Sequence, residues 1–182
     1  YIRLWTPSDA GYDSSNPFRN SLARYFIPSE DEWYKAAYYD PSGGTYFDYP
    51  TGSDSEPTPI ASGTAPGTAV YNGQLSGVTG PADVTLAGGL SPYGTMGQGG
   101  NIYELLETEH DFPHMFKPSN IRALRGSTWN GDFDFMASLF RNHTLPHQEI
   151  SFVGFRIASH AIIPEPSTAA LIFCALFAVA TI

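Results

Sequence analysis

Residues 27–33 read Ile-Pro-Ser-Glu-Asp-Glu-Trp, and this stretch carries the clearest structural signal in the chain. Ser29 is a residue type that caps helix N-termini, and Glu32 lies three positions later, which is the spacing of a capping box. The run of carboxylates also suits the positive end of a helix dipole. The stretch therefore predicts a short helix that begins after Ser29 and ends at the Asp-Pro-Ser-Gly-Gly turn of residues 40–44.

The rest of the sequence predicts short strands separated by loops. Trp33, Ala36 and Ala37 recur at helical spacing, so we expect them to face the core. Aromatic anchors interrupt the Gly- and Pro-rich stretch 43–100, which favours ordered loops over a disordered linker. Short apolar segments bounded by turn residues predict strands at 101–107, 122–126 and 152–158, with brief β-like pieces at 68–71 and 83–86. We predict an α+β domain with little regular structure.

The composition excludes several classes of protein. The 182 residues are 42% hydrophobic, which suffices for one domain with a core. Gly 18 and Pro 15, with only 15% charged residues, argue against a helical bundle. The formal net charge is −9 and the Lys and Arg residues are scattered singly. A phosphate backbone therefore finds no basic surface, and we expect no nucleic-acid partner.

Four local patterns occur in order along the chain. They are residues 27–33, Gly-Asn-Ile-Tyr-Glu-Leu at 100–105, Arg-Gly-Ser-Thr-Trp at 125–129 and Gly-Phe-Arg at 154–156. Together they resemble the sulfatase-modifying factor, or formylglycine-generating enzyme, family, whose domain usually reads R-L-P-T-E-A-E-W, then G-N-x-W-E-W, R-G-G-S-W and G-F-R. The resemblance implies the family's irregular, loop-rich α+β fold, related to C-type-lectin-like folds. We expect residues 1–160 to be the C-terminal part of such a domain, because the chain begins with Tyr rather than Met.

The residues of the family's activity are not matched. Its enzymes oxidise a sulfatase cysteine to formylglycine with two active-site cysteines that bind copper, and those positions fall on or near Gly131 and Met136 here. The one cysteine of the chain is Cys174, in an apolar C-terminal run. Copper(I) prefers soft thiolate ligands, which a lone Met thioether does not replace. We predict no copper and a non-catalytic binding module, with a formylglycine-generating oxidoreductase acting on sulfatase cysteine as the alternative.

The resemblance also implies a calcium site. In the family, the G-N-x-W-E loop holds Ca²⁺ through backbone carbonyls and the Glu carboxylate, which are the hard donors that this ion prefers. The matching donors are the carbonyls of Gly100 and Ile102 and the carboxylate of Glu104, while Gly97 stands where the family usually has Asn or Asp. The alternative is that Glu104 pairs with Arg125 or caps backbone amides.

The C-terminal segment forms a separate module. Residues 163–167 read Ile-Pro-Glu-Pro-Ser and precede an uncharged apolar run over 169–182, which resembles the PEP-CTERM sorting signal of exported bacterial proteins. The run is shorter than the roughly 20 residues of a membrane-spanning helix. We expect residues 161–182 to be a sorting signal with an apolar membrane segment, read by an exosortase-type enzyme. The protein would then be exported to the cell surface or extracellular matrix, anchored transiently by this segment.

Weaker patterns leave other sites open. Asp132 and Asp134 would be a hydrolytic carboxylate pair, although residues two apart on a loop more often solvate the surface. Asn72 and Asp83 would contribute to a second metal site, but the loop lengths leave them unassigned. The five histidines flank prolines or stand alone, so we expect surface loops rather than a metal cluster: His110, His114, His143, His147 and His160.

Aromatic and basic residues complete the expectations. Exposed tyrosines such as Tyr46 and Tyr49 would bind sugars, which leaves a calcium-dependent lectin-like adhesin as a third function and an unidentified protein or carbohydrate as the ligand. We expect Arg125 and Arg156 to be structural, bonded to carboxylates such as Glu30 or Glu104. The three tryptophans are expected in the core: Trp5, Trp33 and Trp129.

Overall fold

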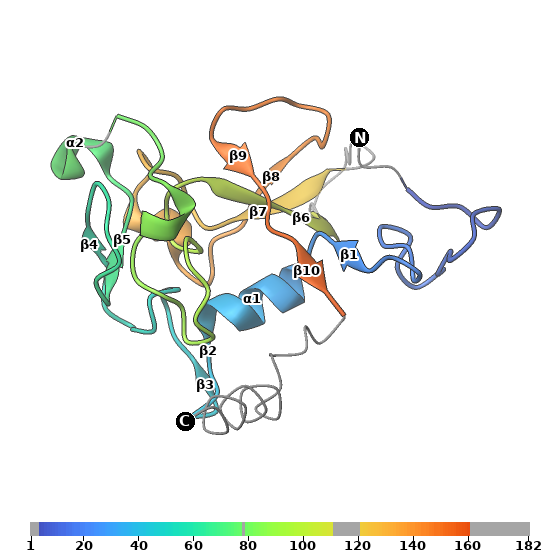
Figure 1. Ribbon diagram of the computed structural model, residues 1–182, viewed down its shortest axis with the longest axis horizontal. Coiled ribbons are helices and arrows are strands. Elements are labelled where there is room, and N and C mark those ends of the chain that lie inside the picture. Colours follow the sequence, from blue (N-terminus) through green and yellow to red (C-terminus); the bar gives the residue numbers. More distant parts are fainter. Residues whose placement is uncertain (1–3, 78, 111–120, 161–182) are drawn as a thin grey trace, which may run out of the picture.

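Helix α1 (Glu30–Tyr38) forms where the sequence predicts it. The computed structural model of the chain describes residues 4–77, 79–110 and 121–160 (Figure 1). The Ser29 hydroxyl accepts a hydrogen bond from the Glu32 backbone N–H at 3.2 Å, and the Glu32 carboxylate accepts one from the Ser29 N–H at 2.8 Å. The capping box is thus confirmed.

A four-stranded sheet lies against this helix. Its strand order is β8-β7-β6-β9, in which β6–β7 and β7–β8 are antiparallel and β6–β9 is parallel. The predicted strands at 101–107 and 122–126 are confirmed as β6 and β7. The bounds are β6 (Tyr103–Glu109), β7 (Arg122–Arg125), β8 (Asn142–Thr144) and β9 (Val153–Gly154).

Both faces of the β6–β7 pair are buried, although the two strands, Tyr-Glu-Leu-Leu-Glu-Thr-Glu and Arg-Ala-Leu-Arg, mix apolar with charged residues. On one face, Trp33, Ala37 and Tyr38 of α1 pack against Leu106 and Ala123. Ala36 is only partly buried, because Tyr38 takes the third core position of the helix. Burial of each large apolar side chain contributes about 1.5–3 kcal/mol, so the helix and sheet stabilise each other. The other face carries Tyr103, Leu105 and Leu124, with Phe140 and Val153 packed on them.

Short strand pairs fasten the loops. Figure 1 shows that β1 and β10 bring an early segment beside the last described residues. The pairs are β1 (Tyr25–Phe26) with β10 (Ala158–Ser159), β2 (Tyr39–Asp40) with β3 (Thr45–Tyr46), and β4 (Thr58–Pro59) with β5 (Thr68–Ala69). The remaining elements are the helix α2 (Gly73–Ser76) and the 3-10 helices η1 (Val84–Leu86) and η2 (Phe133–Met136).

Two strand predictions were wrong. Residues 152–158 do not form one strand: they contribute β9 to the main sheet and lead into β10 of another, with Phe155 and Ile157 exposed in between. The β-like piece at 83–86 is the 3-10 helix η1. The Asp83 carboxylate accepts hydrogen bonds from the Thr85 backbone N–H at 2.8 Å and hydroxyl at 2.6 Å, and this local turn outweighs the β propensity of the segment.

The membrane prediction concerns residues that lie outside the described ones. Within residues 4–77, 79–110 and 121–160, no helix combines the length and apolar character needed to cross a bilayer. The predicted sorting segment, 161–182, is outside this part of the chain and stays a prediction.

Candidate ligand-binding site

Two buried carboxylates, Glu30 and Glu104, each form ion pairs with arginines from distant parts of the chain. Glu30, at the start of α1, is 6% exposed and its carboxylate accepts from Arg125 Nε at 2.9 Å and Arg141 Nε at 2.7 Å. Arg125 also donates to the carbonyls of Ser138, at 2.8 Å, and Phe140. The structural role predicted for Arg125 is therefore confirmed, and one guanidinium ties helix α1 to the loop that follows η2.

The second ion pair engages the carboxylate of the predicted calcium site. Glu104 is 6% exposed and accepts from Trp33 Nε1 at 2.6 Å, Arg156 Nε at 2.5 Å and Arg156 Nη2 at 2.5 Å. Arg125 lies opposite Glu104 in the sheet register but directs its guanidinium to Glu30 instead. The predicted alternative of a Glu104–Arg125 pair was wrong, and Arg156 is the cation that pairs with Glu104.

The four predicted calcium residues come together only in part. Gly97, Ile102 and Glu104 line one cavity of about 490 Å³ with Arg156, and Gly100 is outside its lining. A carboxylate has about four lone-pair sites, and N–H donors already use three of those of Glu104. The guanidinium also opposes a second cation at this carboxylate. This donor set does not suit a calcium ion. Unfolding measurements in calcium and in EDTA would test the predicted site directly.

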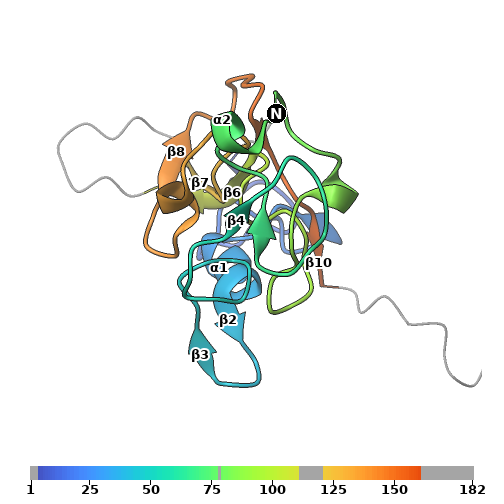
Figure 2. The ribbon, with the colours of Figure 1, turned by 90° about the vertical axis from the view of Figure 1, so that its left-hand side faces the viewer.

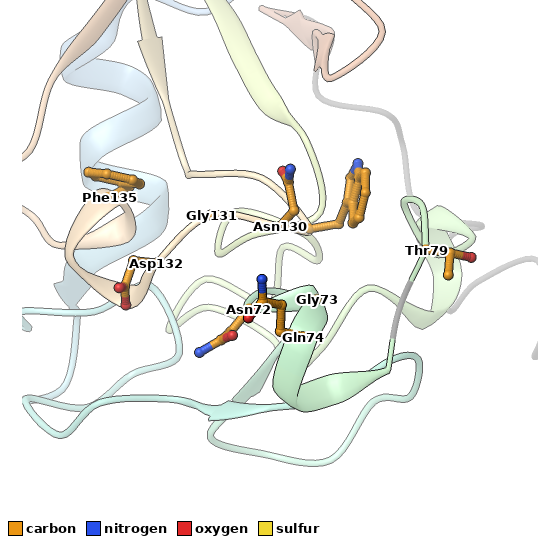
Figure 3. A pocket seen from close by; sticks show the side chains of 9 residues that line it. Asn72, Gly73, Gln74, Thr79, Asn130, Gly131, Asp132 and Phe135 are labelled. Carbon is orange, nitrogen blue, oxygen red and sulfur yellow. The ribbon is translucent and has the colours of Figure 1, made fainter.

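A separate pocket of about 640 Å³ opens between α2 and the loop after β7 (Figure 3). We call it the Asn72–Asp132 pocket. In Figure 3, Asn72 and Gln74 lie on the α2 side, and Asn130 and Asp132 lie on the other side. Asp132 is the one charged residue in the described lining, and Trp129 and Phe135 supply aromatic surface. The lining is Asn72, Gly73, Gln74, Thr79, Trp129, Asn130, Gly131, Asp132 and Phe135.

Local hydrogen bonds fix the loop that forms one wall of this pocket. Trp129 N donates to the Asn101 carbonyl at 2.8 Å, and Gly131 N donates to the Thr128 carbonyl at 3.0 Å. The Ser127 hydroxyl donates to the Asp132 carbonyl at 3.2 Å, which closes the turn from inside. The site is therefore held by a constrained backbone.

Asn72 joins the two walls. Its backbone N–H donates to the Gly131 carbonyl at 2.9 Å, and its φ of 49° is in the left-handed region. Asn tolerates this conformation better than most residues, and it precedes a glycine here. An Asn-Gly dipeptide such as Asn72-Gly73 is a sequence signal for a turn, but nothing in the sequence places that turn beside residue 131.

The two positions matched to the family's cysteines do not share the pocket. Gly131 lines it, whereas Met136 is fully buried in a core cluster with Ala69 and Tyr71. A Cβ on Gly131 would lie 2.5 Å from the Ser127 hydroxyl oxygen, and Ser127 is fully buried. A side chain at residue 131 therefore requires its surroundings to move.

Other predicted residues lie elsewhere or have local roles. Trp129 is only partly buried and lines the pocket, so its placement in the core was wrong, while Trp33 is fully buried. Asp132 accepts from the Phe133 N–H at 2.7 Å, which caps η2. Asp83 caps η1 and is outside the pocket that Asn72 lines.

Of the described histidines, His143, His147 and His160 are exposed as predicted, whereas His110 is half-buried. The rings of His110 and His143 stack at 5.0 Å, and His160 packs 4.5 Å from the ring of Phe26. His114 is outside the described residues. Among the residues that the structure does describe, no three His, Cys, Asp or Glu side chains form a group able to hold a metal ion.

Comparisons with known proteins agree with the fold. Residues 11–161 match the family described as the sulfatase-modifying factor enzyme 1-like domain. Treponema denticola variable protein 1 is similar in structure, with a TM-score of 0.53 and 21% identity over 75% of this chain and 48% of that one. PvdO from Pseudomonas aeruginosa has a TM-score of 0.53 and 23% identity over 76% and 53%. CarF has a TM-score of 0.50 and 19% identity over 86% and 55%.

These structural likenesses confirm the predicted α+β, C-type-lectin-like fold. They show the fold alone, because each identity is below 25%. The chain spans about half the length of the solved proteins that it resembles. No curated protein matches it.

Proposed function

The chain belongs to the sulfatase-modifying factor enzyme 1-like domain family, and from that premise we propose that it is a non-catalytic binding module whose ligand site is the Asn72–Asp132 pocket. The observation that carries the proposal is the lining of this pocket, whose described residues include no Cys or Met side chain. Gly131 lines the pocket without a side chain, and Met136 is fully buried in the cluster with Ala69 and Tyr71. A copper centre needs two soft ligands at one point, and these positions supply none in the pocket.

The environment of Gly131 also supports binding without oxidation. The buried Ser127 hydroxyl occupies space that a residue-131 side chain would need. A cysteine at residue 131 would therefore require the neighbouring packing to move. Substituting cysteine at this one position would not recreate the family's site.

The lining favours a polar ligand that is neutral or carries a positive charge. Asn72, Gln74 and Asn130 offer amide donors and acceptors, and Asp132 adds one exposed carboxylate. Trp129 and Phe135 offer flat apolar surface, which suits a ring or a side chain of the ligand. A protein segment and a carbohydrate both have this chemistry.

The test of this function is the family's own reaction. The full chain is incubated with a Cys-x-Pro-x-Arg peptide, copper and oxygen, and aldehyde formation is followed by mass spectrometry after trapping with hydroxylamine. A family member that has both cysteines is the positive control. We expect no aldehyde above the peptide-only blank. Conversion that the chain catalyses would contradict the proposal and support the oxidoreductase alternative.

We further propose that the protein is exported and attached to the cell surface through residues 161–182. The support is the Ile-Pro-Glu-Pro-Ser sequence followed by an uncharged apolar run. This proposal predicts that the mature surface protein has lost its tail near residues 164–166. Recovery of the intact tail on the surface form, by mass spectrometry of C-terminal peptides, would count against it.

A further inference from the structure

Four tyrosines form a continuous surface on the part of the molecule that surrounds the β2–β3 hairpin, and we call them the tyrosine platform. The ring of Tyr46 lies 5.4 Å from that of Tyr34 and 5.0 Å from that of Tyr39. The ring of Tyr93 stacks on Tyr39 at 6.3 Å with an interplanar angle of 27°. The rings come from α1, both strands of the hairpin and the loop before β6.

The platform stands on a fixed scaffold. Tyr39 and Tyr46 are directly opposite each other in the hairpin register, and the Phe47 N–H donates to the Tyr38 carbonyl at 2.9 Å. The loop that carries Tyr93 is fastened to the helix, because the Ser91 hydroxyl donates to the Ala36 carbonyl at 2.7 Å. Figure 2 shows the hairpin projecting from the body of the domain. The rings therefore need little ordering when a ligand binds.

The two outer rings are open to a ligand. Tyr46 is 48% exposed and Tyr93 is 46% exposed, while Tyr39 between them is half-buried. The hairpin turn beside them, residues 41–44, is exposed and consists of Pro, Ser, Gly and Gly. Two cationic side chains approach the platform. Lys35 Nζ lies 5.6 Å from the Tyr39 ring, and the buried Arg125 guanidinium lies 5.3 Å from the Tyr34 ring.

We propose that the tyrosine platform is a second binding site, for a neutral polysaccharide with flat, β-linked pyranose units. In a β-1,4-glucan the hydroxyls are equatorial, so both faces of each sugar present C–H groups, which stack on the electron-rich face of an aromatic ring. The phenol and turn hydroxyls are suited to hydrogen bonds with the sugar edge. The platform combines ring faces with phenol hydroxyls, which matches a sugar that presents C–H groups on its faces and hydroxyls along its edge. A net charge of −9 disfavours an anionic polymer.

This site is independent of the pocket, because none of its four tyrosines lines the Asn72–Asp132 pocket. It uses no metal, so sugar binding is expected to persist in EDTA. The platform therefore differs from the calcium-dependent lectin alternative in its residues and in its response to chelation.

The test is isothermal titration of the full chain with cellohexaose in EDTA, with the coiled maltohexaose as comparator. We expect cellohexaose to bind more tightly than maltohexaose. The double variant Tyr46→Ser, Tyr93→Ser should lose affinity by about tenfold or more. Both rings are half-exposed, so these substitutions leave no cavity in the core, and unchanged near-ultraviolet circular dichroism verifies the fold.

Tyr25→Ser is the matched control, because Tyr25 is 60% exposed on β1, outside the platform. It should bind cellohexaose as the wild type does. The proposal is overturned if cellohexaose does not bind, if it binds no better than maltohexaose, or if the folded double variant binds within twofold of the wild type.

Discussion

Replacing Glu30 by Gln removes the charge that joins the start of α1 to the loop bearing the pocket. Arg125 is 5% exposed, so the substitution leaves its guanidinium buried without its anion. Removal of one partner of a buried ion pair costs about 3–5 kcal/mol. Two features favour the lower end of this range of cost. Arg125 keeps its hydrogen bonds to the carbonyls of Ser138 and Phe140. The Arg141 side chain is 43% exposed, so water can solvate its charge. We expect a loss of about 3 kcal/mol in the free energy of unfolding.

Urea unfolding followed by circular dichroism measures this loss, and thermal unfolding should show Tm lower by about 6–12 °C. Asp31→Asn is the control, since Asp31 is exposed in the same helical turn and should lose less than about 1 kcal/mol. A loss below about 1 kcal/mol in Glu30→Gln, or an equal loss in both variants, would refute the role assigned to the Glu30–Arg125 pair.

Three further predictions use the same unfolding measurements. Gly131→Ala should lower the free energy of unfolding by about 1–3 kcal/mol, because the new Cβ would overlap the buried Ser127 hydroxyl. Gly80→Ala is the control, since the space around its Cβ is open and its stability should not change. Equal stabilities of the two variants would contradict this prediction. Burial alone would raise the pKa of Glu32, but hydrogen bonds from Arg19 and the helix cap outweigh it and lower that pKa. The carboxylate's contribution is then complete above the ordinary glutamate pKa of about 4.3 and is lost as pH falls through the lower native value, so the stability gap between wild type and Glu32→Gln should close in acid; a constant gap would contradict this. Tm should be the same in calcium and in EDTA, and a calcium-dependent gain that Glu104→Ala abolishes would instead establish the predicted calcium site.

Features encoded by neighbouring residues could be predicted from the sequence. The capping box at Ser29 and Glu32 depends on a three-residue spacing, and it formed as predicted. The strands β6 and β7 were also found from local sequence, because short segments with apolar residues such as Leu105, Leu106 and Leu124 lie between turn residues. The piece at residues 83–86 has β-branched residues, and there one aspartate side chain formed a turn that the propensity did not reveal.

Long-range pairing was the part that the sequence could not determine. Arg125 and Arg156 were each expected to meet a carboxylate, and both do. Which carboxylate each one meets depends on where α1 crosses the sheet. The pocket was missed for the same reason, because the contact between Asn72 and Gly131 joins loops that are distant in the sequence. Trp129 was predicted to lie in the core because a large apolar side chain is usually buried. Its residue type does not show that a pocket opens beside it.

The most direct test of a binding module without copper chemistry is a copper(I) titration of the Cys174→Ser chain against a chromophoric chelator. This variant has no cysteine, so binding must come from the folded domain's other side chains. We predict that the chain takes no stoichiometric copper(I) from the chelator. Tight binding of one copper(I) per chain, lost on unfolding, would contradict a binding module without copper chemistry. It would support the oxidoreductase alternative.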